Sequence, residues 1–269
     1  MVRVGLVGCG TIGSRVAQAL NRKYASIARI TALHDTNPAH ARRLQRRLTP
    51  RPAILPLFPL IRRSDLVIEA ASAAAVLPLV TQALRANRHV LVMSVGGLLF
   101  DRTWHRAARR SRGRLLIPSG ALAGLDGVKA MAIGRLRRVS LTTRKPPRAL
   151  ADAPYVRRRG LRLERLTRPA VIFEGTPRAV VRAFPQNTNI AAALSLASGA
   201  GGASVARIRV VADPGTRRNV HELDVEGDCG RIRCRIESRP SANPKTSELA
   251  VRSAIASLGR FFDQVNIGT

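Results

Sequence analysis

Lysine, acidic residues, aromatic residues and cysteine are all scarce in this chain of 269 residues. Lys and Arg together number 46, but only four of them are lysine, and with 16 Asp plus Glu the net charge is +30. Aromatic residues make up 3% of the chain and are not interleaved with the arginine runs, so the stacking surfaces that hold single-stranded nucleic acid are missing. We therefore interpret the arginine excess as a solvated surface and predict no nucleic-acid partner.

Cysteine is limited to Cys9, Cys229 and Cys234, an odd number without a C-x-x-C pair, which predicts reduced thiols and no metal site. The longest apolar segment, LVIEAASAAAVLPLV, contains Glu69 and Pro78 and is shorter than the roughly 20 apolar residues of a membrane span. The N-terminus enters an alternating apolar run directly, without the features of a signal peptide. These absences predict a cytoplasmic protein with no membrane segment.

The first motif is VGCGTIG, between an apolar run over residues 2–7 and a helical pattern that continues to residue 23. Its glycines have the G-x-G-x-x-G spacing in which the first forms a tight turn, the second admits a pyrophosphate and the third allows close helix packing. Amides at the start of the helix would face the phosphates. The candidates for cofactor binding in this loop are Gly8, Gly10, Thr11, Ile12 and Gly13.

A second predicted strand, over residues 28–35, ends in Asp35. Asp35 follows Gly13 at close to the ~20-residue offset at which a carboxylate binds a ribose 2′-hydroxyl. This position favours NAD, because a carboxylate repels the 2′-phosphate of NADP. Arg42 and Arg43 nearby keep NADP possible.

Strands and helices continue to alternate up to residue 120, which predicts an α/β fold with a doubly wound parallel sheet of the Rossmann type over residues 1–120. Small residues follow two of these strands, and Ala71 is a candidate for close approach to the cofactor. The regular alternation of strands and helices then ends, and we predict a mixed-sheet α+β domain over 121–242 that is catalytic and forms the dimer. We expect the last segment, 243–269, to form a helix that packs back on the first domain.

Three strands are predicted close together at 206–213, 219–227 and 230–238, and we expect them to pair antiparallel. The middle one contains His221, whose imidazole has the right pKa for proton transfer, although a single strand histidine also suits a structural role. Lys145 and Lys245 stand out because nearly all other cations are arginine, and a compact ammonium is not interchangeable with a guanidinium. Asn189 is predicted as the N-cap of a helix rich in small residues.

The whole chain resembles the aspartate dehydrogenase family in segments spread from end to end. The segments that carry the resemblance are VGCGTIG, SVGGL, PSGALAGLDG, TRKPP, FPQNTNIAAALSLA, VVADP, NVHELDVEG and ANPKTS. The resemblance implies NAD(P)-dependent oxidative deamination of L-aspartate, through iminosuccinate, to oxaloacetate and ammonia. It also implies a homodimer that serves NAD biosynthesis.

The resemblance assigns residues as well. The family's catalytic histidine falls on His221, and its NAD-contacting alanine and asparagine fall on Ala121 and Asn189. Because L-aspartate carries two carboxylates, we expect cations or amide donors around it. The candidates for that role are Lys145, Asn243, Lys245 and Thr246.

Two other functions remain open at this point. A dehydrogenase or imine reductase for another small amino or oxo acid has the same two-domain plan, although His221 lacks the paired-histidine signature of dihydrodipicolinate reductase. The second alternative is a non-catalytic NAD-binding protein with a basic surface for nucleic acid. Steep salt dependence of nucleic-acid binding would separate this protein from an enzyme.

Overall fold

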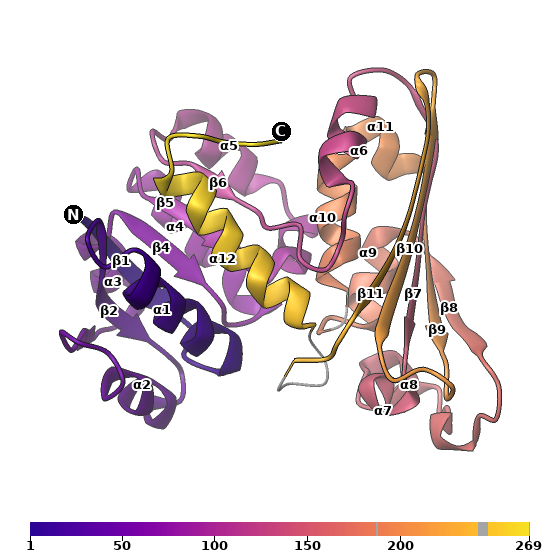
Figure 1. Ribbon diagram of the computed structural model, residues 1–269, viewed down its shortest axis with the longest axis horizontal. Coiled ribbons are helices and arrows are strands. Elements are labelled where there is room, and N and C mark those ends of the chain that lie inside the picture. The colour runs from indigo at the N-terminus through magenta and orange to yellow at the C-terminus, as the bar shows by residue number, and fades with distance from the viewer. Residues whose placement is uncertain (187, 242–246, 269) are drawn as a thin grey trace. The chain divides into compact units, whose positions relative to one another are not determined.

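A computed structural model describes residues 1–186, 188–241 and 247–268. The chain divides into two compact units, the first made of Met1–Pro118 and Val251–Asn266 and the second chiefly of Ser119–Ala250 (Figure 1). Within the described residues, no helix combines the length and apolar composition needed to cross a bilayer. The same residues contain no cluster of three His, Cys, Asp or Glu side chains suited to a metal ion.

The first unit is built on a six-stranded parallel sheet in the order β3-β2-β1-β4-β5-β6. Its strands are β1 Val2–Val7, β2 Ala28–His34, β3 Ala53–Ile54, β4 Leu66–Glu69, β5 His89–Val92 and β6 Leu115–Leu116. The strand order reverses between β1 and β4, and ligands of such sheets bind outside the carboxyl ends of the strands at that reversal. The predicted doubly wound fold is therefore confirmed.

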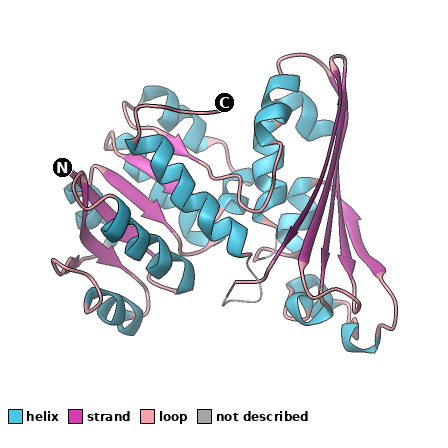
Figure 2. Ribbon diagram, viewed as in Figure 1, coloured by secondary structure: helices cyan, strands magenta, loops and turns pink. Residues whose placement is uncertain are grey.

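Helices cover both faces of this sheet (Figure 2). One buried cluster joins Leu20, Leu44 and Leu258, from three helices, to Val4 and Leu6 of β1. The helices of that face are α1 Thr11–Lys23, α2 Pro38–Gln45 and α12 Glu248–Phe262. The remaining helices of the unit are α3 Leu57–Arg63, α4 Ala73–Arg85, the 3-10 turn η1 Val95–Leu99 and α5 Thr103–Arg110.

The short elements β3 and α3 are absent from the sequence prediction. Four prolines between residues 50 and 59 break the hydrophobic periodicity there. In the structure, Pro56 is the N-cap of α3 and Pro59 lies in its first turn, where a missing N–H costs no helical hydrogen bond. The prolines therefore lie at the start of this helix and do not prevent it from forming.

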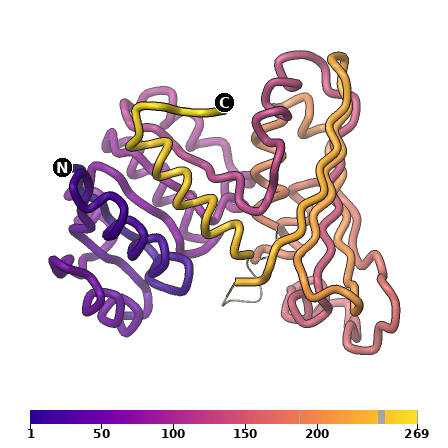
Figure 3. Tube along the Cα trace, in the orientation of Figure 1, coloured from indigo at the N-terminus to yellow at the C-terminus, as the bar shows by residue number. Residues whose placement is uncertain are grey.

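The second unit contains a mixed five-stranded sheet in the order β11-β10-β7-β9-β8. Its strands are β7 Leu136–Lys145, β8 Ala170–Gly175, β9 Ala206–Ala212, β10 Asn219–Gly227 and β11 Gly230–Ser238. The antiparallel hairpin of β10 and β11 is confirmed (Figure 3). The expected pairing of β9 with β10 is wrong, because β7 lies between them, antiparallel to β10 and parallel to β9. A parallel pair needs a long crossover, and the helical segment between β7 and β9 supplies it.

One face of this second sheet is covered by helices (Figure 2). They are α6 Leu125–Met131, α9 Pro177–Ala183, α10 Asn189–Ala197 and α11 Gly199–Val205, while α7 Pro147–Leu150, α8 Pro154–Arg158 and the 3-10 turn η2 Leu163–Arg165 lie in the connection after β7. Burial alternates along β10: His221, Leu223 and Val225 are buried, and the acidic residues between them are half-buried. The sheet therefore has one covered face and one polar face.

Candidate active site

The glycine loop after β1 separates into positions required by packing and one that is not. Gly8 has φ +91°, and a Cβ there would lie 2.5 Å from the backbone of Ala70. A Cβ at Gly13 would lie 1.9 Å from the Gly8 carbonyl oxygen. At Gly10, by contrast, no described heavy atom beyond its own chain neighbours lies within 4 Å of the Cβ position. The packing of the fold does not require glycine at Gly10, and the position has the open space that the G-x-G-x-x-G motif leaves for a phosphate.

The start of α1 fits an anion. Gly10 is its N-cap and provides no side-chain cap, and the first turn holds no acidic residue. The first N–H groups of a helix have no partner within it, and the helix dipole places partial positive charge at the same end. The amides of Thr11, Ile12 and Gly13 therefore suit a pyrophosphate.

Asp35 is held beside this loop at the end of β2. Its Oδ2 accepts the Cys9 N–H at 2.7 Å and its Oδ1 accepts the Asn37 N–H at 2.8 Å. A carboxylate has lone pairs for further donors, so both oxygens remain able to bind ribose hydroxyls. Burial, with a smaller contribution from Asp35, raises the pKa of the Cys9 thiol to about 12, which leaves Cys9 without nucleophilic character.

A buried carboxylate, Glu69, joins the two loops that follow β4 and β5. Its Oε1 accepts the Ala71 N–H and the Ser94 Oγ–H, and its Oε2 accepts the Ser94 N–H, each at 2.8 Å. Burial raises the pKa of Glu69 above its usual value, against the effect of these hydrogen bonds. Glu69 thus fixes the backbone at Ala71 on the carboxyl side of the sheet, where the sequence placed a cofactor contact.

His221 lies on β10 of the second unit, paired with Thr143 of β7. Its side chain is 2% exposed, and its Nδ1 lies 3.0 Å from Thr143 Oγ1. Burial, and secondarily the positive charge of Lys145, lowers the pKa of His221 to about 3. The imidazole is therefore neutral at neutral pH, which is the form that accepts a proton.

Lys145 lies on the same face of β7 as Thr143, because side chains two residues apart in a strand point to one side. It is 4% exposed, and burial lowers its pKa to about 8. The group is therefore mostly an ammonium at pH 7, in surroundings where an anion would offset the cost of burying its charge. Two residues singled out from the sequence for different roles, His221 and Lys145, thus come together on one sheet face.

Comparison with known proteins also separates a nucleotide-binding part from a second part of the chain. Residues 8–118 match the family model described as "Homoserine dehydrogenase, NAD binding domain", and residues 126–261 match the model "Aspartate dehydrogenase, C-terminal". The chain is 41% identical to an L-aspartate dehydrogenase of Methanosarcina barkeri over the full length of both proteins. It is 39% identical to L-aspartate dehydrogenase 3 of Bordetella bronchiseptica, covering 99% of this chain and 97% of that one. The chain belongs to the L-aspartate dehydrogenase family.

The fold agrees with that family as well. The crystal structure of aspartate dehydrogenase from Thermotoga maritima covers the whole of both chains with a TM-score of 0.73. At 22% identity, this similarity is evidence for the fold alone. It supports the two-part architecture of a Rossmann-type sheet followed by a mixed sheet.

The segment that contains Ala121, which the resemblance to the family predicts as an NAD contact, forms a turn. The Leu122 N–H donates to the Ser119 carbonyl at 3.2 Å, and Ala121 is 2% exposed. Gly120 has φ +66°, and a Cβ there would lie 3.3 Å from a methyl group of Ile190. The turn therefore packs against the first turn of α10.

Asn189, the other family NAD contact, is the first residue of α10 and is half-buried. The N-cap prediction is wrong by one residue: Thr188 occupies that position, and its Oγ1 donates to the Phe184 carbonyl at 2.8 Å. The Thr188 hydroxyl accepts no amide hydrogen bond from the first turn, so α10 begins without a side-chain cap. The substrate candidates Asn243, Lys245 and Thr246 lie outside the described residues.

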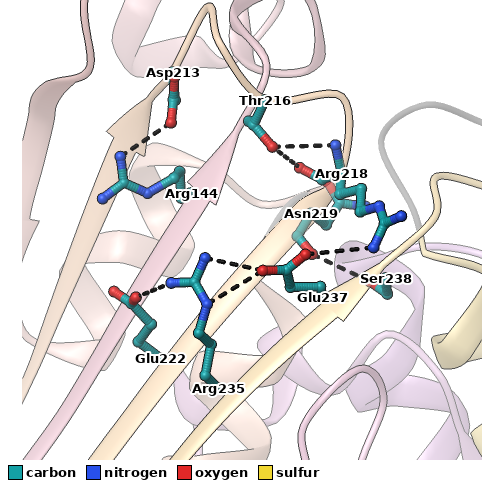
Figure 4. Close-up of polar contacts among 9 residues, drawn as sticks. All are labelled: Arg144, Asp213, Thr216, Arg218, Asn219, Glu222, Arg235, Glu237 and Ser238. Carbon is teal, nitrogen blue, oxygen red and sulfur yellow. Dashed lines mark hydrogen bonds and ion pairs between the residues drawn. The ribbon is translucent and has the colours of Figure 1, made fainter.

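The other face of β10 and β11 carries ion pairs (Figure 4). Arg235 bonds both Glu222 and Glu237, and Arg144 of β7 bonds Asp213 at 3.0 Å. Glu222 follows His221 directly, so its opposite orientation is that expected of a strand. The two faces of β10 therefore have separate chemistry, with the buried histidine on one and solvated ion pairs on the other.

Three polar residues of these sites were not singled out as functional candidates: Glu69, Thr143 and Asn219. In the sequence, Glu69 stands out only as a charged residue within an apolar segment. The sequence does contain a signal for the other two, because residues two apart in a strand lie on the same face. T-R-K thus places Thr143 on the face of Lys145, and N-V-H places Asn219 on the face of His221. The pairing of the two strands was not available from the sequence.

The contrast between Gly10 and Gly13 gives a matched pair of variants. Gly10→Ala should raise the Kd for NAD by about tenfold, because the methyl group enters the space assigned to the pyrophosphate. Its Tm should stay the same or rise, since φ is −70° at this position and alanine restricts the unfolded chain. Gly13→Ala should lower the free energy of unfolding by roughly 1–3 kcal/mol through overpacking. Fluorescence titration with NADH and thermal unfolding would measure both effects, and unchanged NAD affinity in Gly10→Ala would contradict the assignment.

Proposed function

We propose that this protein catalyses the NAD(P)-dependent oxidative deamination of L-aspartate, through iminosuccinate, to oxaloacetate and ammonia. The observation that carries the proposal is the pair on one covered sheet face, a neutral His221 beside the buried ammonium of Lys145. A cation serves a dicarboxylate substrate, and a neutral imidazole serves the proton transfers of imine hydrolysis.

The glycine loop, Asp35 and the first amides of α1 would hold the dinucleotide, with Ala121 and Asn189 as the family's further contacts. Bound NAD supplies the acceptor for the hydride that leaves the aspartate Cα. The position of Asp35 supports NAD over NADP, because its carboxylate would repel a 2′-phosphate.

His221 is assigned the role of base in the hydrolysis of iminosuccinate. Thr143 Oγ1 lies 3.0 Å from Nδ1. We assign the tautomer in which Nδ1–H donates to this oxygen, so that Nε2 carries the lone pair. Nε2 takes a proton from water as the oxygen bonds to the carbon of the protonated imine, and His221 then returns this proton to the nitrogen. The C–N bond breaks to release ammonia as the carbonyl forms, and Nε2 takes up the hydroxyl proton. Lys145 holds a substrate carboxylate throughout these steps.

The first experiment is an absorbance assay at 340 nm with purified protein. We expect L-aspartate to reduce NAD, with NADP slower, and oxaloacetate plus ammonia to oxidise NADH. D-aspartate and L-glutamate are the controls, and both should be inactive. Oxidation of a different amino acid, with no reaction of L-aspartate, would replace the proposed substrate while retaining the enzyme class.

The arginine excess is assigned to the surface and not to nucleic acid. In the second unit, the single carboxylate of Asp224 pairs with Arg231, Arg138 and Arg233. The hydrogen bond from Arg231, with the charges of these arginines, lowers the pKa of the Asp224 carboxyl to about 2. These pairs hold the three guanidiniums on carboxylates of the same strand and leave a net positive charge, but the chain has none of the aromatic residues interleaved with arginine that single-stranded nucleic acid stacks on. A small-molecule substrate is therefore the proposed partner.

We also propose that the protein is a cytoplasmic homodimer that contributes to NAD biosynthesis. The resemblance to the family supports the dimer and the role in NAD biosynthesis, and the few unpaired cysteines support the cytoplasm. Light scattering of the purified protein should give twice the 29.1 kDa chain mass. A monomeric mass at micromolar concentration would reject the dimer.

A further inference from the structure

Asn219 is a fully buried residue whose side chain has no hydrogen-bond partner. It begins β10, is 0% exposed, and neither Nδ2 nor Oδ1 is bonded among the described residues. In that part of the chain it is the one side chain with two such atoms. Asn219 pairs with Ser238 of β11, and its backbone carbonyl accepts the Ser238 hydroxyl at 3.5 Å (Figure 4). A buried amide without partners is destabilising, so its presence calls for an explanation.

The strand register places this amide beside the proposed substrate cation. Val220 pairs with Arg144 and His221 with Thr143. Extending this antiparallel register by one residue, toward the start of β10, sets Asn219 across from Lys145. Alternation puts Asn219 on the same face as His221, away from the ion pairs of Glu222. Strand geometry therefore makes Asn219 adjacent to both residues that the proposed chemistry uses.

We propose that the Asn219 side-chain amide binds a carboxylate of the substrate, next to the Lys145 ammonium. This inference rests on the proposed function, since L-aspartate is the dicarboxylate that both groups would serve. The Nδ2 group offers two N–H donors, and a carboxylate oxygen accepts them in a charge-assisted hydrogen bond. Substrate binding would then satisfy an amide that has no partner within the described part of the chain.

A neutral amide also suits the chemistry better than a second cation. The charge of Lys145 already lowers the pKa of His221. Another positive side chain at this position would lower the pKa further and weaken the imidazole as a base. An asparagine adds a donor to the substrate site without adding charge beside His221.

The test is Asn219→Leu, which keeps the side-chain size and removes both polar atoms. We expect the KM for L-aspartate and the Kd for succinate to rise by about 10-fold to 100-fold. The Kd for NAD should be unchanged. The Tm of the protein without substrate should stay the same or rise, because the variant no longer buries unpaired polar atoms.

Two further variants complete the experiment. Glu222→Gln is the matched control from the polar face of β10 and should leave the KM for L-aspartate unchanged. Asn219→Ala replaces the leucine variant if the latter does not fold, with the same expected loss of affinity. Succinate binding in the presence of NADH is measured by calorimetry, so that one readout does not depend on turnover.

Each outcome decides a separate question. If wild-type protein oxidises L-aspartate and Asn219→Leu has an unchanged KM, the inference is wrong and the proposed function stands. A lower Tm with unchanged affinity would assign Asn219 a structural role and also overturn the inference. If L-aspartate is not oxidised but Asn219→Leu weakens succinate binding at least tenfold, the proposed substrate is wrong and the carboxylate contact is supported. Wild-type protein that neither oxidises L-aspartate nor binds succinate would overturn both.

Discussion

Replacement of His221 with alanine is expected to lower kcat for L-aspartate oxidation by about 100-fold to 10,000-fold, the range that general acid–base groups contribute. The Kd for NAD should change less than about twofold, because the glycine loop and Asp35 belong to the other unit of the chain. Steady-state assays and NADH titration measure the two quantities. His105→Ala, an exposed histidine of the first unit, is the control and should retain full activity.

The low pKa of His221 also predicts how kcat and kcat/KM depend on pH. In the protein without substrate, burial and Lys145 hold that pKa near 3, so the imidazole is a weak base. A bound dicarboxylate adds negative charge beside it and should raise the pKa. The acid limb of kcat, which reports the substrate complex, should therefore lie at higher pH than the acid limb of kcat/KM. Coincident limbs, or a His221→Ala variant within about fivefold of wild-type kcat, would count against His221 as the base.

Thr143 should matter through the orientation of that imidazole. Its hydroxyl contacts Nδ1, so Thr143→Val removes the hydrogen bond while keeping a similar shape. Thr143→Ser preserves the hydroxyl and should restore most of the activity lost in the valine variant. This comparison separates a positioning role from simple packing.

The nucleotide-binding part of the site was predictable from the sequence because its signals are local. Strand, glycine spacing and helix follow one another within the first 23 residues, and each glycine's role follows from backbone geometry. The structure adds a distinction that spacing alone does not contain: Gly8 and Gly13 are required by packing, and Gly10 is not. The same locality explains why the β10–β11 hairpin was predicted correctly.

The second site depends on contacts that spacing does not specify. His221 and Thr143 are 78 residues apart, and their contact exists because β7, and not β9, pairs with β10. A shift of one residue in that register would turn Lys145 to the other face. The resemblance to the family identified His221, but its neighbours Thr143 and Asn219 follow only from the paired strands.

Lys145→Met should raise the KM for L-aspartate by at least about tenfold, because a buried ammonium paired with a carboxylate is replaced by an apolar side chain of similar length. Lys129→Met, at an exposed lysine of the same unit, is the control and should leave the KM unchanged. Lys145→Arg should not restore affinity, since the planar guanidinium is larger and fits a compact buried position poorly.

The pH dependence of this effect has a defined sign. Lys145 has a pKa of about 8 in the folded protein against 10.5 for an unperturbed lysine, so the unfolded chain binds more protons between these values. Stability should therefore rise with pH across that window, and burial of the ammonium below pH 8 costs about 3 kcal/mol. Lys145→Met should remove this cost and be more stable than wild type at pH 7, with the difference vanishing above about pH 10.5.

Substrate affinity should move in the opposite direction to stability. Above pH 8 the ammonium loses its proton, so the KM of wild type should rise by about tenfold per pH unit, while that of Lys145→Met stays flat. A wild-type KM that is constant from pH 7 to pH 10 would reject Lys145 as the carboxylate-binding cation. The combination expected here, a variant that is more stable and binds substrate less well, is the behaviour of a charge retained for binding at the expense of the fold.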